Sequence, residues 1–213
     1  MHSRKELHHI VLDVELVLIS VVQGVALTTL ATEASPVLRS HQLLDYAFVG
    51  TGLLFVLSFW SVALVHAISF LAWPMDLVHY FFYFGVGLLE CLTFTRIEHP
   101  QDWFGFSIAC FVLSGLLYAY DDRLIRRRHA EFSHTAAHRA LYAHIRSGQR
   151  FEMLVLMPAG LLFSVAAWWQ VREHPASATA MAIAQFVLSA MFLANFLRTF
   201  ARRQKLITAC AAD

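Results

Sequence analysis

Long runs of apolar residues, separated by short polar connections, set the pattern along this chain. Six of these runs have close to the ~20 residues that an α-helix needs to cross ~30 Å of hydrocarbon. They predict an all-α, polytopic membrane protein in which residues 1–213 form one domain of six transmembrane helices. The predicted spans cover approximately residues 10–31, 43–71, 75–94, 103–120, 152–170 and 178–200.

Composition supports this class and excludes others. Hydrophobic residues make up 58% of the chain and charged residues only 15%, whereas a soluble domain has about 25% charged residues. The three cysteines are widely spaced, without a CxxC motif or a disulfide framework, so we expect no redox role for them. The sequence contains no phosphate loop, nucleophile elbow, HExxH or dinucleotide fingerprint, and we expect no enzyme active site.

Lys and Arg are distributed unevenly among the connections. Basic residues mark the cytoplasmic ends of membrane helices, and here most lie near the chain ends and in the connection after the fourth span. Six spans also require both termini to share one side of the membrane. We therefore predict that both termini are cytoplasmic. The basic residues on that side are Arg4, Lys5, Arg123, Arg126, Arg127, Arg128, Arg139, Arg146, Arg150, Arg198, Arg202, Arg203 and Lys205.

The one sizeable polar connection, residues 121–150, is basic and rich in histidine. Its composition predicts a helix that extends the fourth span and ends in a turn near Ser147 and Gly148. His134 and His138 have the i, i+4 spacing that can bind a metal on one helix face. The alternative is a basic helix that contacts anionic lipid headgroups. Its arginines lack interleaved aromatic residues, so we expect no binding of nucleic acid.

The third span carries an unusual stripe of polar side chains. At about 100° per residue these side chains fall on one helix face. A membrane helix that keeps acids and a histidine on one face directs them toward something other than lipid. The stripe consists of Asp76, His79, Tyr80, Tyr83, Gly87 and Glu90.

Glu90 lies alone in the outer half of that span. Two interpretations are open: a neutral, hydrogen-bonded carboxyl group, or a group that carries a proton or coordinates a cation. Amides bridge membrane helices, and Gln185 and Asn195 in the last span are the predicted partners.

A short connection between the second and third spans places His66 and His79 at a similar depth, near the cytoplasmic side. Glu152, at the start of the fifth span, and Asp121, at the end of the fourth, lie at the same level. This layer has three possible explanations. It can be a hydrogen-bonded network that locks helix ends, an ion or proton path, or a metal or haem site. In the last case His66 and His79 are the ligands, and Asp76 or Asp13 supports them.

The first span has small and polar residues on one face, which either pack against another helix or line a watery path. Our leading hypothesis is a homo-oligomeric ion channel or transporter subunit whose path follows this helix. Asp13 and Glu15 gather cations at its mouth, and Leu27 forms a hydrophobic constriction. The predicted path residues are Asp13, Glu15, Ser20, Gln23, Gly24, Leu27 and Thr28.

Two rival functions come from other classes. The first is a membrane redox protein that binds haem or a transition metal through His66 and His79, whereas the leading hypothesis requires no cofactor. The second is a signalling or assembly subunit that docks a partner through residues 121–150.

Several features of the plan carry a resemblance to a known family: span order, the basic exit after span four, and the residues Leu57, Ser58, Phe59, Trp60, His66 and Asp76. In these features the chain resembles bacterial homologues of the endolysosomal potassium channel. The resemblance implies a tetramer around a pore lined by the first helix, in the bacterial cytoplasmic (inner) membrane. That family's first helix carries an Arg followed by Phe-Ser-Asp, and the sequence here, VLDVELVLISVVQGVALTTLA, lacks this signature.

Overall fold

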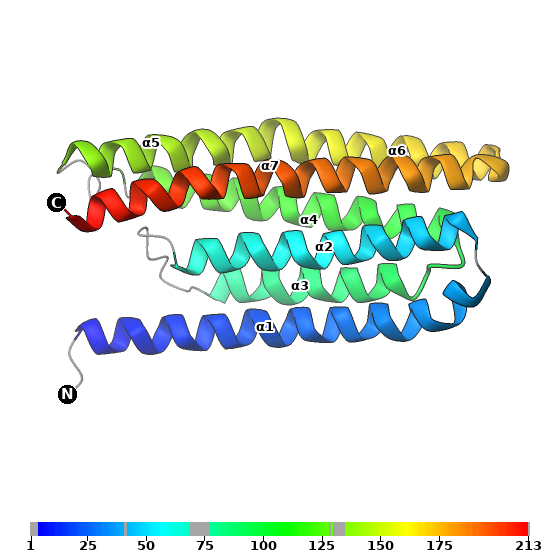
Figure 1. The fold of residues 1–213 in the computed structure, drawn as a ribbon, viewed down its shortest axis with the longest axis horizontal. Coiled ribbons are helices and arrows are strands. Elements are labelled where there is room, and N and C mark those ends of the chain that lie inside the picture. The colour runs from blue at the N-terminus through cyan, green and yellow to red at the C-terminus, as the bar shows by residue number, and fades with distance from the viewer. Residues whose placement is uncertain (1–3, 41, 69–76, 128, 130–134, 213) are drawn as a thin grey trace.

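The computed structural model describes residues 4–40, 42–68, 77–127, 129 and 135–212, and within these ranges the chain is helical, as predicted. The helices lie side by side in one elongated bundle, with both chain ends at the same end of it (Figure 1). We call this the termini end. The long helices are α1 (Arg4–Val37), α2 (Leu43–Ile68), α3 (Leu77–Phe94), α4 (Pro100–Arg127), α5 (Ala136–Phe151), α6 (Met157–Glu173) and α7 (Ala178–Ala212). A π-helical segment, η3 (Glu152–Leu156), joins α5 to α6, and η1 (Leu38–Ser40) and η4 (Pro175–Ser177) are short 3-10 turns.

The outer surface of the bundle is apolar. Large side chains such as Phe81, Leu88, Leu162 and Met191 are exposed by more than half of their surface, which in water would be unfavourable over so wide an area. Within the described residues, five helical stretches are long and apolar enough to cross a bilayer, and α3 contributes a shorter apolar helix, Val78–Phe94. The protein is therefore a polytopic helical membrane protein whose surface contacts lipid.

The connection at residues 121–150 differs from the prediction. Ser147 and Gly148 do not form a turn, because they lie inside α5, and the helix continues through η3 into α6. Instead α5 begins after Thr135, whose hydroxyl oxygen accepts a hydrogen bond from the His138 N–H at 3.3 Å. This N-cap satisfies an N–H group at the helix start, and Leu141 and its neighbours at helical spacing bury the inner face. Packing on that face keeps Gly148 helical.

Pro158 explains the π-helical segment. Proline has no N–H and its ring clashes with the carbonyl group four residues earlier, so a regular α-helix cannot continue through this position. The chain widens locally, and the Met157 N–H donates to the carbonyl oxygen of Glu152, five residues back. Such π-bulges often lie at functional sites, and this one begins at Glu152.

The helices pack in a ring, and α1 fills a gap in it. α2 packs against α7, α7 against α5 and α6, α6 against α4, and α4 against α3. α2 and α3 make little direct contact, and α1 packs against both. The buried α1 residues recur every three or four residues, with Val22 and Gln23 adjacent, and they include Ile19, Val22, Gln23, Ala26, Leu30 and Ala34.

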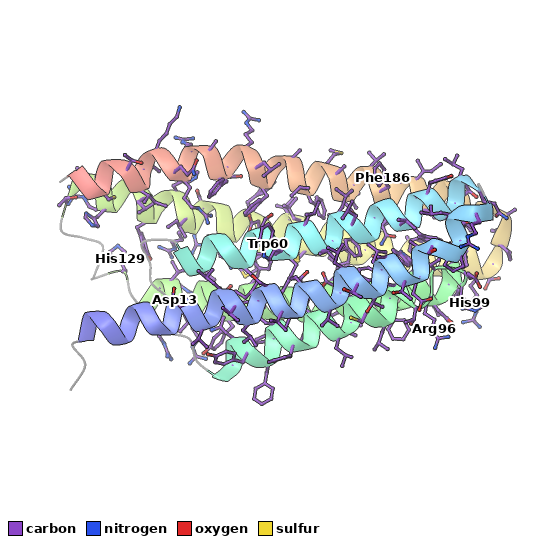
Figure 2. All side chains as sticks on the ribbon, turned by 60° about the horizontal axis from the view of Figure 1, so that its bottom comes forward. Asp13, Trp60, Arg96, His99, His129 and Phe186 are labelled. Carbon is purple, nitrogen blue, oxygen red and sulfur yellow. The ribbon has the colours of Figure 1, made fainter. Side chains whose placement is uncertain are left out.

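Two apolar cores hold the two ends of the bundle. Away from the termini, Phe48, Phe94, Trp103 and Phe104 are fully buried in the larger core. At the termini end a smaller core, which includes Ile125, joins the ends of α4, α5 and α7. In Figure 2 the label His129 lies at the termini end and the label Arg96 at the opposite end.

Candidate functional site

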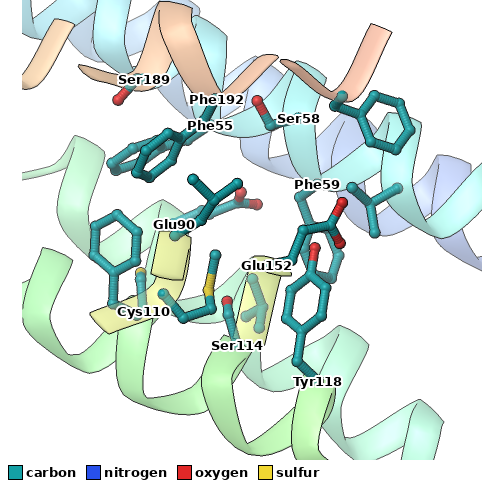
Figure 3. Close-up of a pocket in the computed structure, with 16 residues that line it drawn as sticks. Phe55, Ser58, Phe59, Glu90, Cys110, Ser114, Tyr118, Glu152, Ser189 and Phe192 are labelled. Carbon is teal, nitrogen blue, oxygen red and sulfur yellow. The ribbon is translucent and has the colours of Figure 1, made fainter. Parts of the chain in front are cut away.

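A cavity of about 130 Å³ lies in the middle of the bundle, between α2, α3, α4, α7 and the joined α5–α6 helix (Figure 3). Most of its wall is apolar and aromatic. Two carboxyl side chains, Glu90 and Glu152, also line it, together with polar groups from Tyr118 and three serines. Its lining residues are Phe55, Ser58, Phe59, Val62, Val86, Glu90, Cys110, Phe111, Ser114, Tyr118, Glu152, Leu156, Met157, Ser189, Phe192 and Phe196.

Glu90 is 2% exposed and is held by the first helix. The Nε2 atom of Gln23 donates a hydrogen bond to its Oε2 atom at 3.0 Å. Burying a polar group without such a bond costs several kcal/mol in a hydrocarbon environment. Among the described residues no hydrogen bond joins Glu90 to Gln185 or Asn195, so the prediction of those partners is wrong. Gln185 instead accepts from the indole N–H of Trp103 at 2.7 Å and donates to Ser107 at 3.3 Å.

Glu152 stands at the first position of the π-helical segment and is 9% exposed. Tyr118 on α4 lies beside it, and its charge interacts with that of Arg203 on α7. Figure 3 shows the Tyr118 side chain alongside Glu152 at one end of the cavity. Arg203 is itself 7% exposed, and its Nε atom has no hydrogen-bond partner within the described structure. The π-helical widening therefore coincides with a buried acid, a phenol and a buried guanidinium group.

A second, smaller cavity of about 20 Å³ extends toward the termini end and shares Tyr118 and three other lining residues with the first. It reaches Asp121, whose Oδ1 atom lies 2.9 Å from Nε2 of His79. Both groups are buried. A cavity of this size holds about one water, and the larger one holds several. Because His79 and Glu90 are on the same helix, about 16 Å of α3 separates them at about 1.5 Å per residue.

Beyond Glu90, toward the end far from the termini, aromatic rings pack closely in the bundle interior. Trp103 packs against Phe48 with ring centroids 4.7 Å apart and against Phe94 at 6.1 Å. The ring centroids of Phe48 and Phe104 are 5.8 Å apart. These side chains separate the cavity from the end of the bundle that is far from the termini. Glu90 and Glu152 are thus more easily reached from the termini end of the bundle than from the opposite end.

The predicted path residues of the first helix fall into two groups. Gln23 is 4% exposed and points into the bundle toward Glu90. Ser20, Gly24 and Thr28 are exposed on the outer side of α1, and nothing lies within 4 Å of a Cβ built on Gly24. Asp13 and Leu27 are also exposed, and the side chain of Glu15 lies outside the described part of the structure. In a single chain, this outer group of residues faces the surroundings of the bundle and not its interior.

The residues of the predicted metal or haem site are only partly described. His79 bonds to Asp121, and Tyr83 is buried against the rings of Phe59 and His79. Asp76, His134 and the side chain of His66 lie outside the described residues. Among the residues that the structure does describe, no group of three His, Cys, Asp or Glu side chains could hold a metal ion. His138 forms a hydrogen bond with Thr135.

Sequence reasoning singled out Glu90, Asp121, His79 and Glu152, but it missed Arg203 as an interior group. Arg203 lies in the basic tail, where the charge pattern predicts a residue at the membrane surface. Its burial arises because α7 continues well beyond the predicted span. No sequence signal distinguishes it from its neighbour Arg202, which is exposed.

Comparison with known proteins adds no family. No protein-family model, no curated protein and no solved structure matches the chain. The resemblance to bacterial potassium-channel homologues is supported only as far as a bundle of several apolar, membrane-crossing helices.

Proposed function

We propose that the protein moves protons or small cations across the membrane through the interior of its helix bundle. The observation that carries this proposal is the cavity lined by both Glu90 and Glu152. An ionisable residue near the middle of a bilayer costs about 2.5–3.5 kcal/mol on insertion scales. Two such residues beside the same cavity lower the stability of the protein, which indicates that they serve its function.

The proposed path begins at the termini end. His79 and Asp121 form the entry, Tyr118 and Glu152 come next, and the cavity leads to Glu90. The cavities are large enough for water, and water together with hydroxyl groups can carry a proton between carboxyl groups. The aromatic core beyond Glu90 closes the path in this conformation, so transport requires a second conformation in which these rings separate. This alternation is the usual scheme of membrane transporters.

Purified protein in liposomes tests the proposal. An imposed pH gradient or membrane potential should drive a proton or cation flux, read by a pH-sensitive dye or an ion electrode. Glu90→Gln and Glu152→Gln retain the shape and hydrogen-bonding capacity of each side chain but cannot release a proton. We expect each to reduce the flux by at least about tenfold.

Glu173→Gln is the matched control for Glu152→Gln. Glu173 is an exposed carboxylate at the far end of the same continuous helix, so its substitution should leave the flux unchanged. The proposal fails if the wild-type protein carries no flux across a range of voltage and pH. It also fails if both cavity variants carry the wild-type flux.

A second candidate is a homo-oligomer with a path between subunits, lined by the outer face of α1. The observation that favours it is the exposed polar group Ser20, Gly24 and Thr28 on a surface that otherwise faces lipid. In that case Ser20→Ala and Thr28→Val should change ion flux, and the two cavity variants should not. Mass photometry of the protein in nanodiscs should then show a ring of subunits, whereas a monomer that carries flux excludes this arrangement.

A further inference from the structure

The termini end carries a small rigid platform made by the ends of three helices. Ile125 of α4, Leu141 and Ile145 of α5 and Cys210 of α7 form its apolar core. Leu141 and Ile145 point inward, so the opposite face of α5 is exposed. This face is held in a fixed position by the core behind it, which is a condition for a preformed binding site.

A hollow of about 450 Å³ lies over this exposed face of α5. Arg139, Arg146 and Arg150 follow one another at intervals of seven and four residues, which places them on one side of a helix. Ala143 and Ser147 lie between them and are small, so they form a floor from which the longer arginine side chains rise.

One wall of this hollow comes from His129, which follows α4 in the chain. The ring of His129 stands against Tyr142 with centroids 4.9 Å apart in an edge-to-face arrangement. Both residues line the hollow. The site is therefore concave and is built from two parts of the chain, which distinguishes it from a charged stripe on an isolated helix.

The charge and hydrogen-bonding state of the hollow favour an anion. The Nε atom of Arg146 is buried and has no hydrogen-bond partner among the described residues. None of the described lining residues carries a carboxylate. A guanidinium group is a planar donor that matches the oxygens of phosphate, often through two parallel hydrogen bonds. Three such groups around one hollow can surround a single phosphate.

We propose that this hollow, formed by Arg139, Arg146 and Arg150 with His129, binds a phosphate group. The ligand is either the headgroup of an anionic phospholipid or a soluble phosphate-bearing anion, since both present the same oxygens. Arg150 is two residues from Glu152, so the hollow lies at nearly the same level along the bundle as the Glu152 end of the intramembrane cavity, on another side of the helix. The inference does not depend on ion transport through the bundle.

The test uses the full chain in phosphatidylcholine nanodiscs at about 150 mM salt, where exposed charges further apart than about 8 Å are screened. One arm titrates inorganic phosphate by calorimetry. The other arm adds phosphatidic acid to the nanodisc and counts retained lipid by native mass spectrometry. Because Arg139 and Arg150 are exposed, Arg139→Gln/Arg150→Gln should fold normally, and it should weaken phosphate-group binding by at least about tenfold.

The matched control is Arg123→Gln/Arg127→Gln. These two arginines are exposed at the same end of the bundle, on α4, and do not line the hollow. The control removes the same charge and should leave binding unchanged. Saturable binding in the first arm identifies a soluble anion as the ligand, and binding in the second arm alone identifies the lipid headgroup. Absence of binding in both arms overturns the proposal, as does equal weakening in the control.

Discussion

The contact between α1 and α3 allows a sharp prediction about how the first helix is held. A Cβ atom built on Gly87 would lie 2.3 Å from Cγ1 of Val22. This is far closer than carbon atoms approach one another, about 3.5–4.0 Å at the optimum. Val22 cannot turn aside at low cost, because a β-branched side chain in a helix has one strongly preferred rotamer. Gly87→Ala therefore forces the two helices apart.

The size of the effect follows from two opposing contributions. Adding a methyl group to a closely packed position costs about 1–3 kcal/mol. Replacing glycine by alanine in a helix gains up to about 1 kcal/mol. Gly24→Ala gives the second contribution alone, since nothing lies within 4 Å of its added Cβ. We expect Gly87→Ala to be less stable than Gly24→Ala by about 1–3 kcal/mol, a difference in which helix propensity cancels.

Unfolding of the purified protein in mixed micelles, with increasing fraction of a denaturing detergent and tryptophan fluorescence as the signal, measures this difference. Val22→Ala removes the Cγ1 atom that causes the clash. In the Val22→Ala background, Gly87→Ala should cost much less than in the wild type, because contacting residues show non-additive effects. Equal stability of Gly87→Ala and Gly24→Ala would refute the close approach of α1 and α3.

Three further predictions concern single contacts. Gln23→Leu should destabilise the protein by about 1–2 kcal/mol by removing the donor to Glu90, and Gln23→Leu/Glu90→Leu should recover most of this loss in the same unfolding assay. If the double substitution instead costs the sum of the two single substitutions, the bond between Gln23 and Glu90 is contradicted. Asp121→Ala should lower the free energy of unfolding by about 1.5–3 kcal/mol by removing the hydrogen bond to His79, and Asp121→Asn should lower it less. Equal stability of the two variants in thermal denaturation would argue against this bond. Thr135→Ala should lower stability by about 0.5–2 kcal/mol and raise amide exchange in the first turn of α5. Unchanged exchange there would exclude the cap.

Helix positions were largely predictable from the sequence, and helix ends were not. Apolar length places each span, because an unpaired peptide group in hydrocarbon is costly and a helix pairs all of its own. This argument does not apply outside the bilayer. There, α5 depends on the N-cap at Thr135 and on Leu141 and Ile145 packing against α4 and α7. These contacts keep residues 136–151 helical, and the turn expected near Gly148 does not form.

The polar stripe on α3 shows what the pattern of polar residues in the sequence can predict and what it cannot. It identified His79, Tyr83 and Glu90, and all three are buried. It could not identify their partners, since Gln23 lies 67 residues from Glu90 and Asp121 lies 42 residues from His79. Gln23 stood among Ser20, Gly24 and Thr28 in the sequence pattern, and only the packing of α1 against α2 and α3 separates it from them.

The sequence by itself determined that this chain is an all-helical membrane protein and that certain acids and histidines lie within its spans. Only the tertiary structure decided which helix faces which, and so placed Glu90 and Glu152 beside the same cavity and buried Arg203 where its charge interacts with that of Glu152. The physical reason is that lipid and protein interior are equally apolar. In a soluble helix the polar face marks the outside, whereas here hydropathy alone does not distinguish a side chain that packs inward from one that meets lipid.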